Sequence, residues 1–130
     1  MGVDTNVLVR FLVRDHETQF QRAQRLIQRE VGAGQPVFVS LLVLLETECA
    51  LRSRYQLQKP AMVATFSALL DATGIELEDE AAIEEALFLW KDNTVEFVDC
   101  LVGARNRRLG CRATATFDAR AVKLPGFARV

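Results

Sequence analysis

The sequence predicts an α/β fold in which helices cover both faces of a mostly parallel sheet of four to five short strands. Short apolar segments alternate along the chain with longer segments whose apolar residues recur at helical spacing. Glycine and proline residues, as at positions 32–36, break the chain between such segments. No internal repeat, low-complexity tract or linker interrupts this pattern, so residues 1–130 are expected to form a single domain.

The first part of the chain is expected to contain two strands and three helices. Asp15 and Ser40 are residue types that cap helix N-termini, and the polar residues 4–6 should turn the chain after an apolar start. The glycines and the proline at 32–36 should end the second helix. The expected elements are, in order, a strand at 1–3, a helix at 7–13, a helix at 15–31, a strand at 37–39 and a helix at 40–55.

The second part is expected to contain three helices and three strands. Pro60 suits the first turn of a helix, Asp79 should begin another helix, and Gly110 suits a helix end. Residues 75–78 alternate apolar and acidic side chains, as a half-buried strand does. The expected elements are a helix at 60–74, a strand at 75–78, helices at 79–91 and 98–109, a strand at 112–117 and a short edge strand at 127–130.

Composition and charge are those of an ordinary compact globule. Half of the 130 residues are apolar and a quarter are charged, which excludes a disordered chain. The formal net charge of -1 gives no polybasic signature, but 13 of the 16 basic residues are arginine, the side chain suited to bidentate phosphate contact. Six acids gather in residues 76–85, where we expect a solvated acidic face, so the rest of the chain is net basic.

The cysteines and the apolar runs bear on localisation. The chain has three cysteines, Cys49, Cys100 and Cys111, none of them in a Cys-x-x-Cys pair, and one histidine. We therefore expect plain buried or half-buried thiols rather than a zinc site or a disulfide framework. No signal peptide is visible, and the apolar run at 37–45 is far too short to span a bilayer. We therefore expect a soluble, cytoplasmic protein without a membrane partner.

Four acidic residues lie far apart in the sequence, each at a place where a parallel sheet would bring them together. Asp4 and Asp118 follow predicted strands, and ligands of open sheets bind beyond the carboxyl ends of the strands. Asp99 lies near a helix N-terminus, where the helix dipole favours an anion, and Glu46 lies in the second turn of the helix after residues 37–39. Carboxylates among apolar residues are costly to bury without a cation, so the four predict a site for a hard divalent metal.

Each of these acids also has a purely structural interpretation. Asp4 can cap the first helix, and Asp99 and Asp118 can be caps or turn residues. Glu46 shares a helix face with apolar neighbours, so it is expected to lean toward the apolar side. Glu48 lies about 200° further around the helix and is expected to be a solvated or arginine-paired surface acid.

The sequences around the four acids together resemble the motifs of PIN-domain nucleases. They occur in the order typical of that family and cover essentially the whole chain. The short length without added domains resembles the VapC-type toxins of bacterial toxin–antitoxin pairs. The matching segments are Val3-Asp4-Thr5-Asn6, Val39-Ser40 followed by Glu46 and Ala50, Asp99-Cys100-Leu101, and Thr114-Ala115-Thr116-Phe117-Asp118 followed by Leu124-Pro125-Gly126.

This resemblance implies a three-layer α/β/α fold and an endoribonuclease that depends on Mg²⁺ or Mn²⁺. Such a protein is usually a homodimer and acts on RNA until a cognate VapB-type antitoxin neutralises it. Magnesium commonly takes only one or two carboxylates directly, so Asp4 and Asp99 are the expected direct ligands. Glu46 and Asp118 would then act through water or hold a second ion. The metal would activate water as the nucleophile and offset charge that develops on the phosphate.

Further residues are expected to support the carboxylates or to contact RNA. Thr5, Asn6 and Thr116 are candidates for orienting the carboxylates, although Thr116 is equally explained as an ordinary strand residue. Arginines that follow Asp4 and arginines that follow Asp99 are candidates for phosphate contact, and those at the end of the Asp99 helix are explained nearly as well by the helix dipole. The candidate RNA-binding residues are Arg10, Arg14, Arg105, Arg107 and Arg108.

The sequence departs from the family pattern at two points, and two other functions stay open. The segment before Asp4 is short, and Asp118 is followed by Ala119-Arg120, where a second acid and a phenylalanine are commoner. A phosphatase of the haloacid-dehalogenase type also begins with a strand-end aspartate, but Asn6 stands here in place of its second aspartate. A non-catalytic module would use the acids to attract a basic partner.

Overall fold

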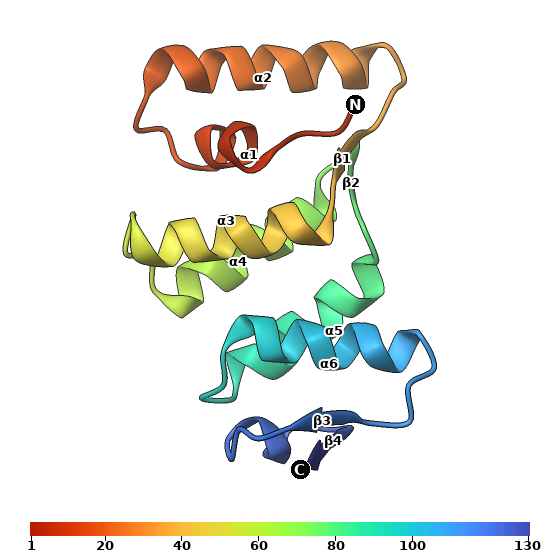
Figure 1. The fold of residues 1–130 in the computed structure, drawn as a ribbon. Coiled ribbons are helices and arrows are strands. Elements are labelled where there is room, and N and C mark those ends of the chain that lie inside the picture. The colour runs from red at the N-terminus through yellow and green to blue at the C-terminus, as the bar shows by residue number, and fades with distance from the viewer. The chain divides into compact units, whose positions relative to one another are not determined.

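The computed structural model describes residues 1–130 and divides into two compact units, Met1–Glu78 and Asp79–Val130 (Figure 1). Each unit combines helices with one pair of strands. The elements of the first unit are α1 (Thr5–Leu12), α2 (Glu17–Gly32), β1 (Val37–Val39), α3 (Leu41–Ser53), α4 (Lys59–Asp71) and β2 (Ile75–Leu77). Those of the second unit are α5 (Glu80–Lys91), α6 (Phe97–Arg108), β3 (Thr114–Thr116), the 3₁₀ helix η1 (Ala121–Lys123) and β4 (Phe127–Arg129).

The predicted α/β fold with parallel strands is confirmed, whereas the single sheet of four to five strands stays a prediction. Strand β1 pairs in parallel with β2, and β3 pairs in parallel with β4, so each unit contains one two-stranded sheet. Val37 and Val39 of β1 are buried while Phe38 between them is exposed, which is the alternation of a strand with one covered face. The single domain expected over residues 1–130 stays a prediction.

The strand predicted at residues 1–3 is present only as one bridge beside β1. Gly2 pairs in parallel with Phe38. The Val3 N–H donates to the Phe38 carbonyl at 3.1 Å, and the Phe38 N–H donates to the Met1 carbonyl at 2.9 Å. This short pairing nevertheless fixes where the chain enters α1.

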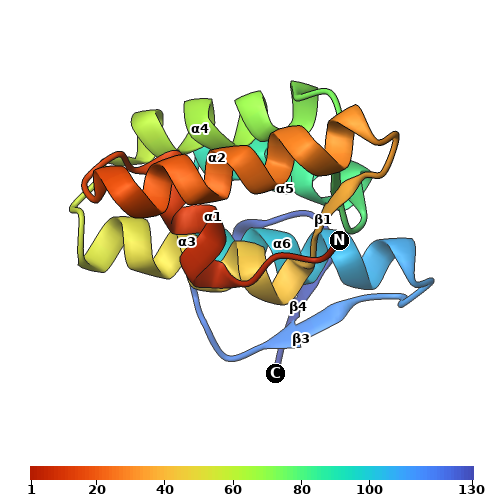
Figure 2. The same ribbon diagram turned by 90° about the horizontal axis from the view of Figure 1, so that it is seen from above.

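Helix α1 packs against both α2 and α3, so it lies between them (Figures 1 and 2). Leu8 and Val9 of α1 are buried, and so are Ala23 of α2 and Leu44 of α3. Burial of such apolar side chains stabilises helices as short as α1, which would be marginal alone in water. Ser40 caps α3 as predicted, with its Oγ accepting from the Val43 N–H at 3.2 Å.

The predicted cap of α2 is wrong. His16, not Asp15, is the N-cap, and its Nδ1 accepts from the Gln19 N–H at 3.2 Å. The Asp15 carboxylate instead accepts from Arg10 Nη1 at 3.1 Å and from the Tyr55 hydroxyl at 3.0 Å. These partners come from other segments of the first unit, so tertiary contacts outweigh the local capping preference.

Gly74 is a position where the backbone and the packing both require glycine. It precedes β2 with a φ of +84°, in the left-handed region that residues with a Cβ rarely adopt. A Cβ added there would overlap the side chain of Val31 from α2. The Gly74 carbonyl also accepts from the Val37 N–H at 2.8 Å, which ties this turn to β1.

Substitution of this glycine is expected to destabilise the first unit. Gly74→Ala should lower the free energy of unfolding by about 2–3 kcal/mol, because backbone strain adds to the overlap with Val31. Gly34→Ala is the matched control, since Gly34 has a φ of +75° but nothing within 4 Å of a Cβ. It should cost only about 1 kcal/mol. Urea unfolding followed by far-UV circular dichroism measures both, and equal costs would contradict the role of Val31.

The second unit is built on α5 and α6, which pack together. Trp90 of α5 and Phe97 of α6 are buried, with ring centroids 5.1 Å apart at an interplanar angle of 46°. Helix α5 begins next to Asp79 as predicted, and Asp79 is its N-cap. The backbone of Asp79 lies in the left-handed region with a φ of +53°, which aspartate tolerates better than most residues. Helix α6 also contacts β3, which places Asp99 and Asp118 in the same unit.

No helix of the chain has both the length and the apolar character needed to cross a membrane. Cys100 is buried, as expected, but Cys49 and Cys111 are exposed. The expectation that all three thiols are at least half-buried is therefore wrong for two of them.

Candidate active site

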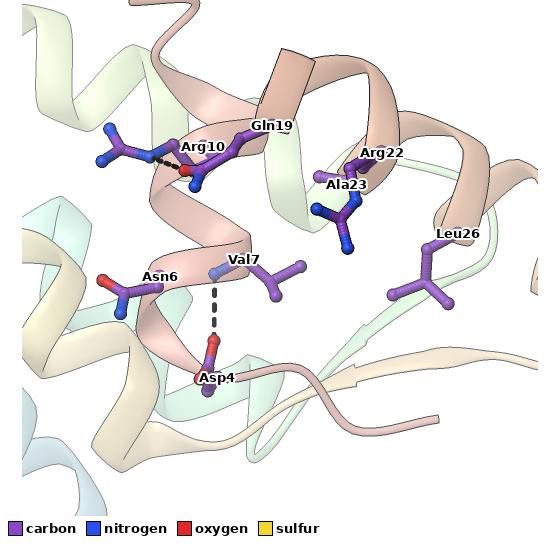
Figure 3. A pocket seen from close by; sticks show the side chains of 8 residues that line it. All are labelled: Asp4, Asn6, Val7, Arg10, Gln19, Arg22, Ala23 and Leu26. Carbon is purple, nitrogen blue, oxygen red and sulfur yellow. Dashed lines mark hydrogen bonds between the residues drawn. The ribbon is translucent and has the colours of Figure 1, made fainter. Parts of the chain in front are cut away.

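Asp4 stands where the N-terminal segment enters α1. It is the N-cap of that helix, with its Oδ1 accepting from the Val7 N–H at 3.0 Å (Figure 3). The side chain is exposed. The structural interpretation of Asp4 as a cap is thus confirmed, and it does not conflict with a functional one. One carboxylate oxygen holds the helix end while the other has no recorded hydrogen bond.

Glu46 of α3 is joined to the start of α1 by a hydrogen bond. The Thr5 hydroxyl donates to Glu46 Oε2 at 2.8 Å, between residues 41 positions apart in the sequence. Thr5 follows Asp4 directly, so this contact brings the first two predicted acids to one region of the first unit. Thr5 therefore makes the kind of contact that was expected of a residue orienting a carboxylate.

The predicted orientations of Glu46 and Glu48 are wrong. Glu46 is exposed, whereas Glu48 is only 5% exposed and its Oε1 accepts from Arg52 Nε at 3.1 Å. Helix α3 buries the side that carries Leu44 and Leu51, and Glu48 lies one turn after Leu44 on that side. The pairing with an arginine was expected for Glu48, but the surface location was not.

Asp99 lies in the first turn of α6 and is half-buried. Burial raises the pKa of the Asp99 carboxyl above its ordinary value, and the negative charges of Asp118 and Glu96 raise it further. The effect of Asp118 indicates that these two acids of the second unit are near enough to repel each other. A carboxylate whose charged form is disfavoured in this way gains from a cation beside it.

Asp118 lies in the loop that follows β3, and two local hydrogen bonds hold it there. The Arg120 N–H donates to Asp118 Oδ1 at 2.8 Å, and the Asp118 N–H donates to the Thr116 hydroxyl at 3.0 Å. Thr116 was expected to orient the carboxylates. It accepts from the backbone of Asp118 and so acts on the loop rather than directly on the carboxylate.

The four predicted acids are thus divided equally between the two units. Asp4 and Glu46 belong to the first, and Asp99 and Asp118 to the second. Neither unit by itself gathers three acidic, histidine or cysteine side chains that could hold a metal ion. A site made by all four carboxylates stays a prediction.

The donor chemistry of both pairs fits a hard divalent cation. All four side chains offer carboxylate oxygens, the ligands that Mg²⁺ and Mn²⁺ prefer. Burial and the negative charge of Asp118 both raise the pKa of Asp99, and a cation beside Asp99 would offset both effects. The first pair offers Asp4 and Glu46, each with one oxygen already held by a protein donor. Such contacts orient ligands before a metal binds.

A cavity of about 430 Å³ lies against Asp4 (Figure 3). Its walls come from the start of α1 and from the face of α2 that packs against it. Asn6, another residue expected to support the carboxylates, lines this cavity and has no recorded hydrogen bond. The lining residues are Asp4, Asn6, Val7, Arg10, Gln19, Arg22, Ala23 and Leu26.

Arg10 and Arg14, expected as RNA contacts, are ion-paired within the first unit. Arg10 donates to Asp15 and, at 2.5 Å, to Gln19 Oε1. Arg14 pairs with Glu17 at 2.7 Å and lies over the ring of Phe20, 4.5 Å from its centroid. Neither guanidinium presents an uncompensated charge.

Arg105, Arg107 and Arg108 of α6 are likewise ion-paired, in the second unit. Arg105 Nη1 donates to Asp79 Oδ2 at 2.7 Å, and Arg108 donates to the same carboxylate. Arg107 donates to Glu85 and to the carbonyl of Pro125.

The Asp79 side chain is only 4% exposed, so the solvated acidic face predicted for residues 76–85 is wrong at this position. Its partners, Arg105 and Arg108, are two of the arginines that the sequence predicted to contact RNA.

Arg22 was missed by the sequence-based prediction although it lines the cavity beside Asp4. It is exposed and has no recorded ion pair or hydrogen bond, unlike Arg10 on the opposite wall. The only signal in the sequence is its position, one residue before Ala23 and four before Leu26, which belong to the apolar stripe of the helix. Helical spacing alone could not have shown that α1 lies opposite.

Comparison with known proteins identifies relatives over the full length of the chain. The family model described as "PIN domain" matches residues 1–126. A protein of Aquifex aeolicus (strain VF5) named "VapC ribonuclease" is 25% identical over 128 residues, which are 98% of this chain and 93% of that protein. A solved structure of the Mycobacterium tuberculosis toxin VapC20, described as cleaving the sarcin-ricin loop, is 23% identical, with 99% of this chain and 97% of that chain covered and a TM-score of 0.36.

Proposed function

This chain belongs to the PIN-domain family, and we propose from this premise that it is an endoribonuclease dependent on Mg²⁺ or Mn²⁺. The observation that carries the proposal is the match of the family model to residues 1–126, a stretch that contains all four acids of the predicted motifs. RNA is the proposed substrate because a relative aligned over 98% of this chain is named a ribonuclease.

In this proposal Asp4, Glu46, Asp99 and Asp118 hold the cation or cations. When bound, a divalent ion supplies positive charge that offsets charge developing on the phosphate and lowers the pKa of a coordinated water. The only histidine of the chain, His16, caps α2, so the proposal assigns no histidine as a base.

The chain's own residues pre-position these ligands. The Val7 N–H fixes one oxygen of Asp4, the Thr5 hydroxyl fixes Glu46, and the Arg120 N–H fixes Asp118. Ligands held in this way lose little conformational freedom when the cation and the substrate bind. The same contacts would keep the carboxylates from rotating away between turnovers.

The proposal extends to partners. The aligned relative named VapC ribonuclease supports a toxin of the VapC type, neutralised by a cognate VapB-type antitoxin. We further propose a homodimer. In α4 the apolar side chains of Met62, Phe66 and Leu69 are buried, and small side chains such as Ala61 and Ala64 are exposed for contact with a second copy. Light scattering of the purified chain measures the mass directly.

Metal dependence of RNA cleavage is the direct test of the proposed activity. The purified chain, incubated with a panel of structured RNAs that includes tRNA, should cleave at least one of them in Mg²⁺ or Mn²⁺. Addition of a chelator should abolish cleavage, and excess metal should restore it, because the carboxylates cannot by themselves neutralise charge on the phosphate. Cleavage that persists at the same rate in chelator would contradict the metal assignment.

Two further measurements separate the alternatives. A haloacid-dehalogenase-type phosphatase would hydrolyse a small phosphomonoester and form a trapped aspartyl-phosphate on Asp4, which the ribonuclease would not. A non-catalytic module would bind a basic partner tightly, without heat of Mg²⁺ or Mn²⁺ binding in calorimetry. Metal binding with RNA cleavage and without phosphomonoester turnover supports the proposed function over both.

A further inference from the structure

The cavity against Asp4 is large enough for more than an ion. Its volume of about 430 Å³ lies within the range of small-molecule sites, which is about 300–1,000 Å³. Asp4 stands at one side, and Arg22 enters from α2 on the other (Figure 3). All of its walls belong to the first unit. The cavity is therefore a candidate for a substrate group next to a proposed metal ligand.

Arg22 is the uncompensated cation of this cavity. Arg10 also lines it, but its guanidinium donates to Asp15, to Gln19 and to the Tyr55 hydroxyl. Arg22 has no recorded acceptor, so its five N–H donors remain available. A planar guanidinium with free donors is the protein group that best matches a phosphate.

The other walls fit the body that carries such a phosphate. Val7, Ala23 and Leu26 form an apolar side, and the amide of Asn6 adds a donor and an acceptor without a recorded partner. This mixture of one cation, one amide and apolar surface suits a nucleotide unit of RNA, with its phosphate on the guanidinium and its sugar or base on the apolar side.

The charge of Asp4 sets a condition on this binding. A carboxylate in the same cavity repels a phosphate, and the repulsion falls when a divalent cation neutralises the carboxylate. Asp4 does not neutralise the charge of Arg22, because the two side chains form no ion pair. Metal and RNA are thus expected to bind cooperatively, with each raising the affinity for the other.

We propose that Arg22 binds a phosphate of the substrate RNA in the cavity next to Asp4, beside the phosphate that is cleaved. The inference rests on the proposed ribonuclease function and assigns one substrate-binding residue to it. An acidic side chain of a protein partner could match the same guanidinium, but the free amide and the adjacent metal ligand favour RNA. Binding of such a protein partner by Arg22 is one of the outcomes that the test below distinguishes.

The test compares variants of α2 in RNA binding and cleavage. Binding is measured with a fluorescently labelled RNA that the parent chain cleaves, in saturating Mg²⁺ or Mn²⁺. Every variant is compared in the same Asp99→Asn background, which prevents cleavage and weakens metal binding equally in all of them. Arg22→Ala should weaken binding roughly tenfold and reduce the slope of log affinity against log salt by about 0.7–0.9, the effect of one phosphate contact. Without the Asp99→Asn substitution, Arg22→Ala should raise KM for RNA and leave kcat within about twofold of the parent value.

Arg25→Ala is the matched control. Arg25 is exposed on the same helix and does not line the cavity, so its removal changes the net charge equally without removing the proposed contact. It should weaken binding less than about threefold. Arg22→Lys keeps the charge but not the fork of donors, and should fall between Arg22→Ala and the parent. Thermal melting checks that all three variants remain folded.

The outcomes separate this inference from the proposed function. If the parent chain cleaves no RNA in either metal, the proposed function fails. If the parent cleaves but Arg22→Ala and Arg25→Ala have equal KM and equal salt slopes, Arg22 binds no phosphate and only this inference is overturned. Loss of binding to the cognate antitoxin with unchanged RNA affinity would likewise overturn it, in favour of a carboxylate of the partner.

Discussion

Replacing Asp99 with asparagine is expected to abolish most RNA cleavage while leaving the chain folded. The variant removes one oxygen ligand and one negative charge from the proposed metal site. The rate should fall at least about 10²-fold, because several kcal/mol of transition-state stabilisation depends on the bound ion. Initial rates of cleavage of labelled RNA in saturating Mg²⁺ or Mn²⁺ measure the loss. Asp4→Asn should show a loss of similar size.

Stability separates this result from simple misfolding. Burial, Asp118 and Glu96 raise the pKa of Asp99, so the folded chain binds this proton more tightly than the unfolded chain. Stability contributed by the protonated form is therefore lost as pH rises from the ordinary aspartate value through the raised pKa. At neutral pH the ionised side chain is a cost, which asparagine removes. The variant should keep a free energy of unfolding within about 1 kcal/mol of the parent, or above it.

Glu84→Gln is the control for the loss of one negative charge. Glu84 is exposed on α5 in the same unit and has no recorded partner. Cleavage by this variant should stay within about twofold of the parent, since surface substitutions away from a site change little. A fully active Asp99→Asn chain would refute the assignment of Asp99 as a ligand. An inactive chain that has also lost several kcal/mol of stability would contradict the argument made from its raised pKa.

Replacing Asp79 with asparagine is expected to give the largest loss of stability in the second unit. The Asp79 side chain is 4% exposed and accepts from Arg105 and Arg108. Asparagine keeps the tolerance for left-handed backbone and the capping oxygen but removes the charge. Two arginines then lose their anion, and the free energy of unfolding should fall by about 2–3 kcal/mol, less than for a fully buried pair because both arginines reach solvent.

The pH dependence of this loss has a definite sign. Burial alone would raise the pKa of Asp79, but hydrogen bonds from Arg105 and Arg108 outweigh it and hold the pKa below the ordinary value. A lowered pKa contributes stability above the ordinary aspartate value, and this contribution is lost as pH falls through the lowered pKa. The parent and Asp79→Asn should therefore differ at neutral pH and converge only in acid, below about pH 4.

The fluorescence of Trp90 reports this unfolding locally. Trp90 is the only tryptophan of the chain and is buried in the second unit, so its emission follows that unit during urea unfolding. Glu85→Gln is the matched control, because the Glu85 side chain is 39% exposed and its pairing with Arg107 is worth little in water. It should cost less than about 1 kcal/mol. Equal costs for the two variants would refute the special role of Asp79.

Local sequence was sufficient for most of the elements. Ser40 was identified as a cap because a cap depends on a side chain and a backbone N–H only three residues away. The strand at 37–39 was predicted from a short apolar run, and the strand expected at 75–78 was predicted from alternating apolar and acidic residues. Their parallel pairing followed from the helices between them. The cap of α2 could not be predicted, because Tyr55, 40 positions away, holds Asp15.

The sequence by itself determined which acids to consider, the parallel strands and the family of the chain, because motif spacing and periodicity are local properties that survive without coordinates. Only the tertiary structure decided which charges are compensated. It paired Arg105 with Asp79 across 26 residues, turned Glu48 rather than Glu46 into the interior, and left Arg22 unpaired beside Asp4. Partners of this kind are chosen by which elements pack together, and the spacing within one helix contains no information about the helix opposite.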